Sequence, residues 1–260
     1  MSITEAVIPA GGHLEGAFLE MAGTPWRALA PIGGIPCLQL AVNAVREAGI
    51  ERIIAVADND VRERISGVDV WRQASTTGPA NILIGLREVR GTDPVLLCPC
   101  DLPLLNGNHI RNFLDRCPAG ADIIAGVAGR KLYESVFADA PPSQFINLAD
   151  LGPITNSSAF VVRPSTLLSS ESLLGKAFES RKSQMRMALL LGPALVWKFA
   201  ARTLTVADVQ KRVEYVLRCQ IGVVTDIAPE LTYDIDSVND YSYARSYFDN
   251  KYGNAAIRRP

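Results

Sequence analysis

The stretch Pro94-Val-Leu-Leu-Cys-Pro-Cys-Asp-Leu-Pro-Leu-Leu105 decides the fold of this chain. Its first part, Val95–Cys98, is a continuous apolar run, which is typical of a strand buried on both faces of a parallel sheet. The run leads to Asp101, and Pro99 and Pro103 interrupt regular structure on either side of that carboxylate. Open α/β sheets bind ligands at the carboxyl ends of their strands, so Asp101 is a candidate for chemistry. The alternative is that Asp101 merely caps the helix that follows.

The first half of the chain alternates between strand and helix patterns. Apolar side chains at i, i+3, i+4 and i+7 predict a helix from Leu38 to Gly49. Such alternation predicts an α/β fold with a single Rossmann-like, mostly parallel twisted sheet flanked by helices. The other predicted elements of this half are strands over Glu5–Ala10, Arg52–Ala57, Val68–Trp71, Val95–Cys98 and Asp122–Val127, and helices over Ala80–Val89 and Ile110–Cys117.

The second half departs from this alternation. We expect one domain over residues 1–250 with a helical insertion near 165–219, and a flexible tail over 251–260. The elements predicted there are a loop over Pro141–Pro153, a strand over Ala159–Arg163, the helical block, strands over Ile221–Ile227 and Leu231–Asp236, and a last helix to about Phe248.

Composition excludes several classes of partner. The 260 residues carry a formal net charge of −1, so bulk electrostatics predicts neither a nucleic-acid nor an anionic-membrane partner. The five cysteines form no CxxC pair, and their odd number fits a reducing cytoplasm. The start of the chain lacks the basic and apolar regions of a signal peptide, and the apolar run Met187–Ala201 is shorter than the ~20 residues of a membrane span. We expect a cytoplasmic protein, with homo-oligomerisation left open.

Gly11 and Gly12 follow the first predicted strand. Two consecutive glycines let the backbone approach a phosphate closely and offer bare N–H donors to it. The surrounding sequence contains no P-loop lysine, and the glycine spacing differs from GxGxxG, so the pair alone names no ligand.

Asp234 and Asp236 lie at the end of a late predicted strand. In a strand their side chains would share one face, about 7 Å apart, so we expect one of them to meet Asp101 around a divalent cation. Two carboxylates together with substrate phosphates and water are the ligands that Mg²⁺ prefers. The alternative for each aspartate is a cap on the final helix.

Taken in order, several segments resemble the signature of the MobA-like nucleotidyltransferases. The resemblance implies a fold of the nucleotide-diphospho-sugar transferase type. It also implies Mg²⁺-dependent transfer of an NMP group from an NTP to a phosphorylated small molecule, such as a molybdopterin-like cofactor or a sugar phosphate, with release of pyrophosphate. The segments that carry it are Ala10-Gly11-Gly12, Arg27-Ala28-Leu29, Pro31–Pro36, Gly78-Pro79-Ala80-Asn81 with Gly85-Leu86, Asp101-Leu102-Pro103-Leu104, Asn156-Ser157-Ser158 and Asp234–Asp240.

The resemblance also assigns roles to individual residues. It implies catalytic roles for Arg27 and Asp101, and a metal site formed by Asp101 with Asp236 or Asp234. Asn156 and Ser157 would contact the acceptor, in a loop. The implied nucleotide-binding residues are Ala10, Gly11, Gly12, His13, Gly78, Pro79, Asn81 and Asp101; for His13, a solvated loop histidine is the competing interpretation.

The chain departs from the family pattern in its first loop. Arg27 stands where the family has lysine, and the family's Arg-Met pair is missing. A working replacement would direct the Arg27 guanidinium toward the Gly11-Gly12 loop and Asp101, whereas a surface arginine would not. Two other functions stay open. One is a glycosyltransferase of similar fold, for which the Asp-x-Asp expected at the metal is absent around Asp101. The other is a nucleotide-binding protein that has lost catalysis.

Overall fold

The computed structural model describes residues 3–171, 175 and 192–256. The strands are β1 (Glu5–Pro9), β2 (Pro31–Ile32), β3 (Ile35–Pro36), β4 (Arg52–Ala57), β5 (Val70–Gln73), β6 (Val95–Leu97), β7 (Ile123–Gly129), β8 (Ile146–Leu148), β9 (Gly152–Val162) and β10 (Ile221–Val224). The helices are α1 (Gly16–Ala22), α2 (Cys37–Glu47), α3 (Asn59–Arg62), α4 (Gly78–Leu86), α5 (Gly107–Asp115), α6 (Arg130–Val136), α7 (Pro164–Ser169), α10 (Pro193–Ala200), α11 (Val206–Leu217) and α12 (Val238–Ala256), with 3-10 turns η1 (Arg27–Leu29) and η2 (Pro229–Leu231).

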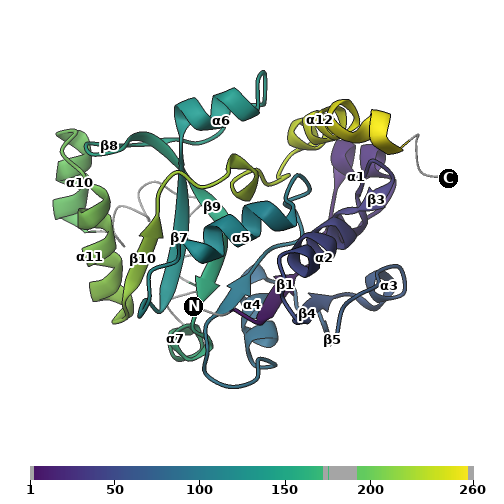
Figure 1. The fold of residues 1–260 in the computed structure, drawn as a ribbon, viewed down its shortest axis with the longest axis horizontal. Coiled ribbons are helices and arrows are strands. Elements are labelled where there is room, and N and C mark those ends of the chain that lie inside the picture. The colour runs from purple at the N-terminus through teal and green to yellow at the C-terminus, as the bar shows by residue number, and fades with distance from the viewer. Residues whose placement is uncertain (1–2, 172–174, 176–191, 257–260) are drawn as a thin grey trace.

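Eight of these strands form one twisted sheet (Figure 1). Their order is β10-β7-β9-β6-β1-β4-β5, with β8 paired to β9, while β2 and β3 form a separate hairpin. Pairs within β6-β1-β4-β5 are parallel, as is β10-β7, but β9 runs antiparallel to both β6 and β7. The predicted mostly parallel α/β sheet is therefore confirmed.

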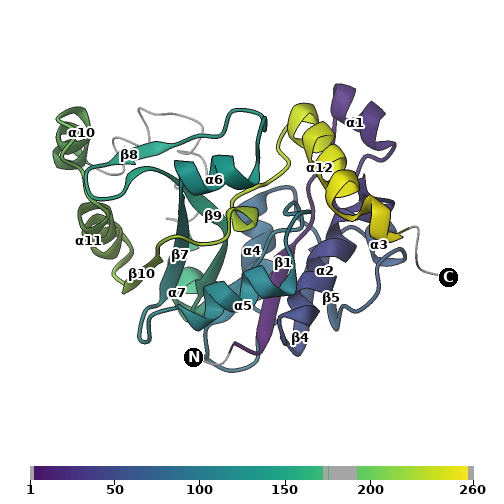
Figure 2. The same cartoon turned by 45° about the horizontal axis from the view of Figure 1, so that its top comes forward.

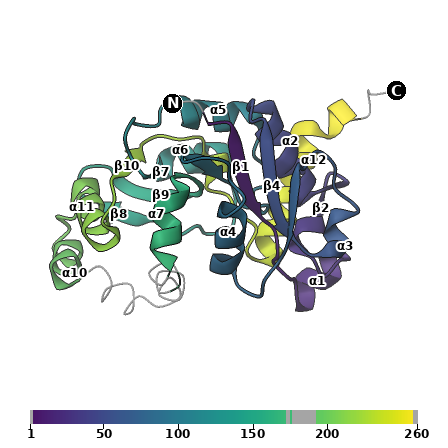
Figure 3. The same cartoon turned by 90° about the horizontal axis from the view of Figure 1, so that it is seen from below.

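Helices cover both faces of the sheet. In β1, Ala6 and Ile8 pack in one cluster with side chains of α2 and α5, whereas Val7 packs on the other face with side chains of α4 and α7. Because successive strand side chains point to opposite faces, a strand that is apolar at every position is buried on both. Figure 3 shows the two layers of helices, with α2 and α5 on one side of the strands and α4 and α7 on the other.

The two ends of the sheet carry different helical elaborations. Helices α10 and α11 lie beside β10 (Figure 1), and α11 begins at a capping box formed by Thr205 and Asp208. At the other end α12 lies beside α1 (Figure 2), where the rings of Phe18 and Tyr241 are 5.1 Å apart. The Tyr241 hydroxyl also donates to the backbone oxygen of Pro31 at 2.7 Å. Helix α12 thereby fixes the segment that precedes it, and it continues past the domain boundary we expected at residue 250.

Three predictions for the second half need correction. The segment 156–158, predicted as a loop, lies inside β9, because pairing with β7 outweighs the turn-forming character of its residues. The segment Leu231–Asp236, predicted as a strand, is not one: Leu231 is the last residue of η2, and the residues after it have no regular secondary structure. The Ile235 N–H donates to the backbone oxygen of Asp101 rather than to a strand neighbour. The predicted loop Pro141–Pro153 contains β8.

The helical block predicted over 165–219 contains α7, α10 and α11. The parts of that prediction at 172–174 and 176–191 lie outside the described residues. Among the helices that the structure describes, none combines the length and the apolarity needed to cross a bilayer.

Helix α4 packs so closely on the sheet that Gly85→Ala should destabilise the protein. A β-carbon at Gly85 would collide with Val7 Cγ1 and lie 3.2 Å from Val56 Cγ2. Overpacking of this kind costs on the order of 1–3 kcal/mol, although Gly→Ala in an open helix position is stabilising. Gly129→Ala is the matched control, because a β-carbon there meets nothing within 4 Å. Denaturant unfolding of both variants measures the difference; equal stability would contradict the packing argument.

Candidate active site

Asp101 lies just beyond the end of β6, at the carboxyl edge of the sheet. Its side chain is 18% exposed. The helix that follows is capped by Asn106, whose side chain accepts hydrogen bonds from the N–H groups of Asn108 and His109. Asp101 is therefore not the helix cap, and its carboxylate remains available for other partners.

The segment before α12 brings two further carboxylates to Asp101. The Ile235 N–H donates to the backbone oxygen of Asp101 at 3.1 Å, which places Asp234 and Asp236 on either side of that bond. The cap of α12 is formed instead by Ser237 and Asp240, which exchange side-chain and backbone hydrogen bonds of 2.7–3.2 Å. Neither of the two candidate aspartates is used as a cap.

Arg27 joins these acidic groups. Its Nη1 donates to Asp101 Oδ2 at 3.1 Å and to Asp236 Oδ1 at 2.9 Å. The Arg27 N–H donates to the backbone oxygen of Gly12 at 2.9 Å, and a β-carbon added at Gly12 would lie 3.6 Å from Arg27 Nε. The predicted orientation, with the guanidinium between the glycine loop and Asp101, is confirmed. Burial opposes the charge of Arg27, but Asp101 and Asp236 more than compensate and raise its pKa.

The site carries more negative charge than Arg27 neutralises. Burial raises the pKa of Asp101, and Asp236 raises it further, while Arg27 acts in the opposite direction. Burial, followed by the charges of Asp101 and Asp236, raises the pKa of Asp234 to about 7. Two carboxylates thus share one guanidinium while Asp234 adds further negative charge beside them, an arrangement that favours the binding of an additional cation.

Three thiols beside the site remain neutral. Burial, and secondarily the charge of Asp101, raises the pKa of Cys37, Cys98 and Cys100, that of Cys98 to about 12. Thiolate chemistry at neutral pH is therefore disfavoured here, because a thiol must lose its proton to act as a nucleophile or a metal ligand.

Gly11 lies against Asn81 in the first turn of α4. A β-carbon at Gly11 would lie 2.6 Å from both Ala74 Cβ and Asn81 Nδ2, so the position has no room for a side chain. Asn81 is buried, and its Oδ1 accepts from the Ser75 N–H at 2.6 Å. Thr77 caps the helix that begins with Gly78 and Pro79.

The remaining predicted nucleotide residues border the same loop. Ala10 is buried, and its N–H donates to the oxygen of Val56 at 2.8 Å, which anchors the end of β1 to β4. His13 is more than half exposed, and its Nε2 lies 3.6 Å from Asp58 Oδ2 at the end of β4. The structure therefore places His13 at the rim of the loop beside a carboxylate.

The two predicted acceptor residues in β9 differ in burial. Ser157 is buried; its hydroxyl donates to the oxygen of Ala159 at 2.7 Å and accepts from the Gly126 N–H at 2.9 Å. Because its hydroxyl is engaged by the backbone, we do not retain Ser157 as an acceptor ligand. Asn156 is exposed and lies where the pairing of β9 with β7 is irregular. Ser158 is half-buried and lies close enough to Asp234 to act against the rise in the pKa of that carboxyl. Ser158 belongs to the segment that carries the resemblance, although the prediction assigned it no role.

The MobA-like NTP transferase domain matches residues 6–169, which contain the glycine loop, Arg27 and Asp101. The chain belongs to the MobA-like NTP transferase family. Comparison with the curated protein sequences gives no match.

Solved structures show the same fold as this MobA-like NTP transferase. A hypothetical transferase from Thermus thermophilus is similar with a TM-score of 0.82 and 22% identity, over 92% of this chain and 100% of its own. A nucleotidyl transferase from Methanothermobacter thermautotrophicus gives 0.58 and 18%, over 96% and 100%. The 4-diphosphocytidyl-2C-methyl-D-erythritol synthase from Anaerococcus prevotii gives 0.54 and 15%, over 95% and 98%.

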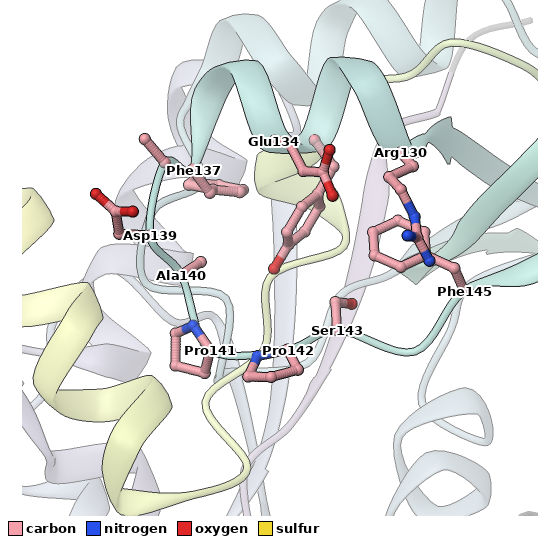
Figure 4. Close-up of a pocket in the computed structure, with 11 residues that line it drawn as sticks. Arg130, Glu134, Phe137, Asp139, Ala140, Pro141, Pro142, Ser143 and Phe145 are labelled. Carbon is pink, nitrogen blue, oxygen red and sulfur yellow. The ribbon is translucent and has the colours of Figure 1, made fainter.

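A pocket of about 380 Å³ lies between α6 and the loop that follows it (Figure 4). Its lining includes Arg130, Glu134, Phe137 and Phe145, and the Arg130 guanidinium lies 4.5 Å from the centre of the Phe145 ring. The Phe137 ring contacts that of Tyr233 at 4.8 Å. Another lining residue, Tyr133, is near enough to Asp234 for the charge of that carboxylate to contribute to the raised pKa of its hydroxyl, after burial as the main cause.

The described residues by themselves do not assemble a complete metal centre. Within the described parts of the chain, no group of three or more His, Cys, Asp or Glu side chains is arranged to hold a metal ion. Mg²⁺ commonly takes one or two carboxylates and completes its shell with phosphate oxygens and water. Asp101 and Asp236, which contact the same Arg27 nitrogen, fit that smaller requirement.

The raised pKa of Asp234 predicts how stability depends on pH. Its pKa is about 7 in the folded protein and about 3.9 when unfolded, so the folded state holds the proton more tightly. The resulting stability is complete below about pH 4 and is lost as pH rises to about 7. Asp234→Asn should remove this loss and stabilise the protein at pH 8 by on the order of 1–3 kcal/mol. Urea unfolding of both proteins between pH 4 and 8 checks the prediction; parallel pH profiles would contradict it.

Proposed function

We propose that this MobA-like NTP transferase moves an NMP group from an NTP to a phosphorylated small molecule and releases pyrophosphate in an Mg²⁺-dependent reaction. The observation that carries the proposal is Arg27 held between Asp101 and Asp236 beside the bare backbone of Gly12. A guanidinium cation, a stretch of backbone that a phosphate can approach, and two carboxylates therefore lie together at one edge of the sheet. Family membership supports the reaction class.

In the proposed reaction, an oxygen of the acceptor phosphate attacks the α-phosphorus of the NTP. The new P–O bond forms as the bond to the β-phosphate bridging oxygen breaks, and pyrophosphate leaves with that electron pair. Positioning and charge neutralisation dominate catalysis of such transfers. The Gly11 and Gly12 N–H groups would bind the triphosphate, Arg27 would bind phosphate oxygens, and Asn81 would hold the nucleoside side of the site.

Mg²⁺ is the cofactor that fits these residues. Asp101 would hold it, with Asp236 as the second carboxylate and Asp234 as the nearest alternative. The chemistry that bound Mg²⁺ supplies is neutralisation of the charge on the phosphates. Asp234, which lies beside Ser158, would link this centre to β9 and the acceptor side.

The acceptor would extend from this centre toward the pocket beside α6. Arg130 forms no ion pair among the described residues, so its guanidinium is free to meet an anionic group while it stacks on Phe145. Asn156 is an exposed residue two positions before Ser158 in β9 and would offer a second polar group to the acceptor.

The proposal is tested in two steps: we measure whether a nucleotide protects the protein against thermal unfolding, and then whether pyrophosphate is released. Thermal unfolding with each of the four NTPs, with and without Mg²⁺, should raise the Tm for one NTP, because a ligand that binds the folded state stabilises it. Pyrophosphate release with sugar phosphates and pterin phosphates then identifies the acceptor. A glycosyltransferase would instead respond to a sugar nucleotide, and a protein without catalysis would show protection without pyrophosphate.

Asp101→Asn should abolish the Mg²⁺-dependent part of that protection and reduce pyrophosphate release at least ~100-fold, because a neutral amide is a poor Mg²⁺ ligand. The fold should persist, since Asn keeps the shape of the side chain. Asp93→Asn, at an exposed position before β6, is the matched control and should behave as the parent. Full activity in a folded Asp101→Asn protein would exclude Asp101 from the metal site.

Arg130→Ala should raise the KM for the acceptor about tenfold, which corresponds to the loss of one charge-assisted hydrogen bond. The protection given by NTP and Mg²⁺ should stay unchanged, because Arg130 forms no contact with Arg27, Asp101 or Asp236 among the described residues. Lys131→Ala, on the same helix but outside the pocket lining, serves as the control. Steady-state kinetics gives a separate KM for the NTP and for the acceptor. An unchanged KM for the acceptor would show that the pocket does not bind it.

A further inference from the structure

The Arg27 guanidinium lies between Asp101 and Asp236, the two carboxylates that are best placed to share a metal ion. A single nitrogen, Nη1, contacts both Asp101 Oδ2 at 3.1 Å and Asp236 Oδ1 at 2.9 Å. A divalent cation that bridges the same oxygens must stand where this nitrogen stands, because metal–oxygen bonds are shorter than these contacts. Binding of the metal between Asp101 and Asp236 therefore requires the guanidinium to move.

A second observation shows where the guanidinium can go. The Nε atom of Arg27 is buried and has no hydrogen-bond partner among the described residues. Gly12 lies beside this atom and contributes no side chain to cover it. A buried donor without a partner is unfavourable, and a phosphate oxygen at the Gly12 loop would satisfy it.

We infer that Arg27 is an exchangeable counter-ion, which neutralises Asp101 and Asp236 in the nucleotide-free protein and is drawn to phosphate when a nucleotide binds. This inference rests on the proposed function. The exchange replaces one cation by another at Asp101, so the mostly buried carboxylate is never left without a positive partner. The carboxylates become open to the metal when Arg27 turns to the phosphate.

The exchange couples the two ligands. A triphosphate that attracts Arg27 increases the affinity for the metal, and by linkage the metal increases the affinity for the triphosphate by the same factor. Without a triphosphate, the metal must compete with Arg27 and binds weakly. Arg27 thus favours loading of the metal together with its nucleotide.

The first test measures binding of Mn²⁺ alone to the full-length protein by electron paramagnetic resonance. Arg27→Gln keeps hydrogen-bond donors but removes the charge, and it should bind Mn²⁺ at least ~10-fold more tightly than the parent. Arg27→Lys keeps a charge and should stay as weak as the parent. Arg72→Gln is the matched control, because Arg72 pairs with Glu88 away from the site. Equal Mn²⁺ affinity in the parent and Arg27→Gln, or tight binding by Arg27→Lys, would overturn the inference.

The second test follows the Arg27 side chain itself. The Nε–H resonance of Arg27, assigned by its loss in Arg27→Gln, should shift when inorganic tripolyphosphate is added without metal. An unchanged resonance at saturating tripolyphosphate would show that Arg27 stays on the carboxylates, and would also overturn the inference. Both measurements dispense with NTP turnover, so their failure leaves nucleotidyl transfer standing. Absence of NTP protection and pyrophosphate release would instead defeat the proposed function.

Discussion

The contact of the Arg27 guanidinium with Asp101 and Asp236 is the interaction on which the site depends. The apolar strand β6 leads to a carboxylate that is mostly shielded from water, and a charge in such a place requires a partner. Arg27 supplies it from η1, and Asp236 joins from the segment before α12. One guanidinium therefore connects three parts of the chain that are distant in sequence, and it holds Asp101 and Asp236 together at the edge where phosphate and metal would meet.

The sheet topology explains why these groups converge. Parallel pairing of β1 with β6 brings the Gly12 loop and Asp101 to the same carboxyl edge, which is where open α/β sheets bind their ligands. The antiparallel strand β9 lies next to β6 and adds Ser158 to the site from the opposite chain direction. Helix α12, anchored through Tyr241, holds the acidic segment against this edge.

Charge balance, more than fold, indicates what the site does. Arg27 contacts Asp101 and Asp236, and Asp234 lies beside them; burial first, and then the neighbouring carboxylates, raise the pKa of Asp101 and Asp234. A metal–triphosphate complex would compensate the charge of both groups, since it brings a cation to the carboxylates and phosphate oxygens to Arg27. The same fold would support other chemistry with another arrangement of charges.

Local patterns in the sequence determined much of this protein. The apolar runs of β1, β4 and β6 and the periodicity of α2 predicted the alternating, mostly parallel sheet, because burial on two faces demands apolar residues at every strand position. Asp101 and the Gly11-Gly12 loop were identified because a strand end followed by special residues marks the functional edge. Features that depend on residues distant in the sequence could be seen only in the tertiary structure. The part of β9 before Ala159 is a strand because β7 and β8 pair with it. The segment at Asp236 is irregular and bonds to Asp101 through its backbone, and the partners of Arg27 lie far from it in the chain. Pairing across such distances is decided by packing and charge in space, which no local pattern encodes.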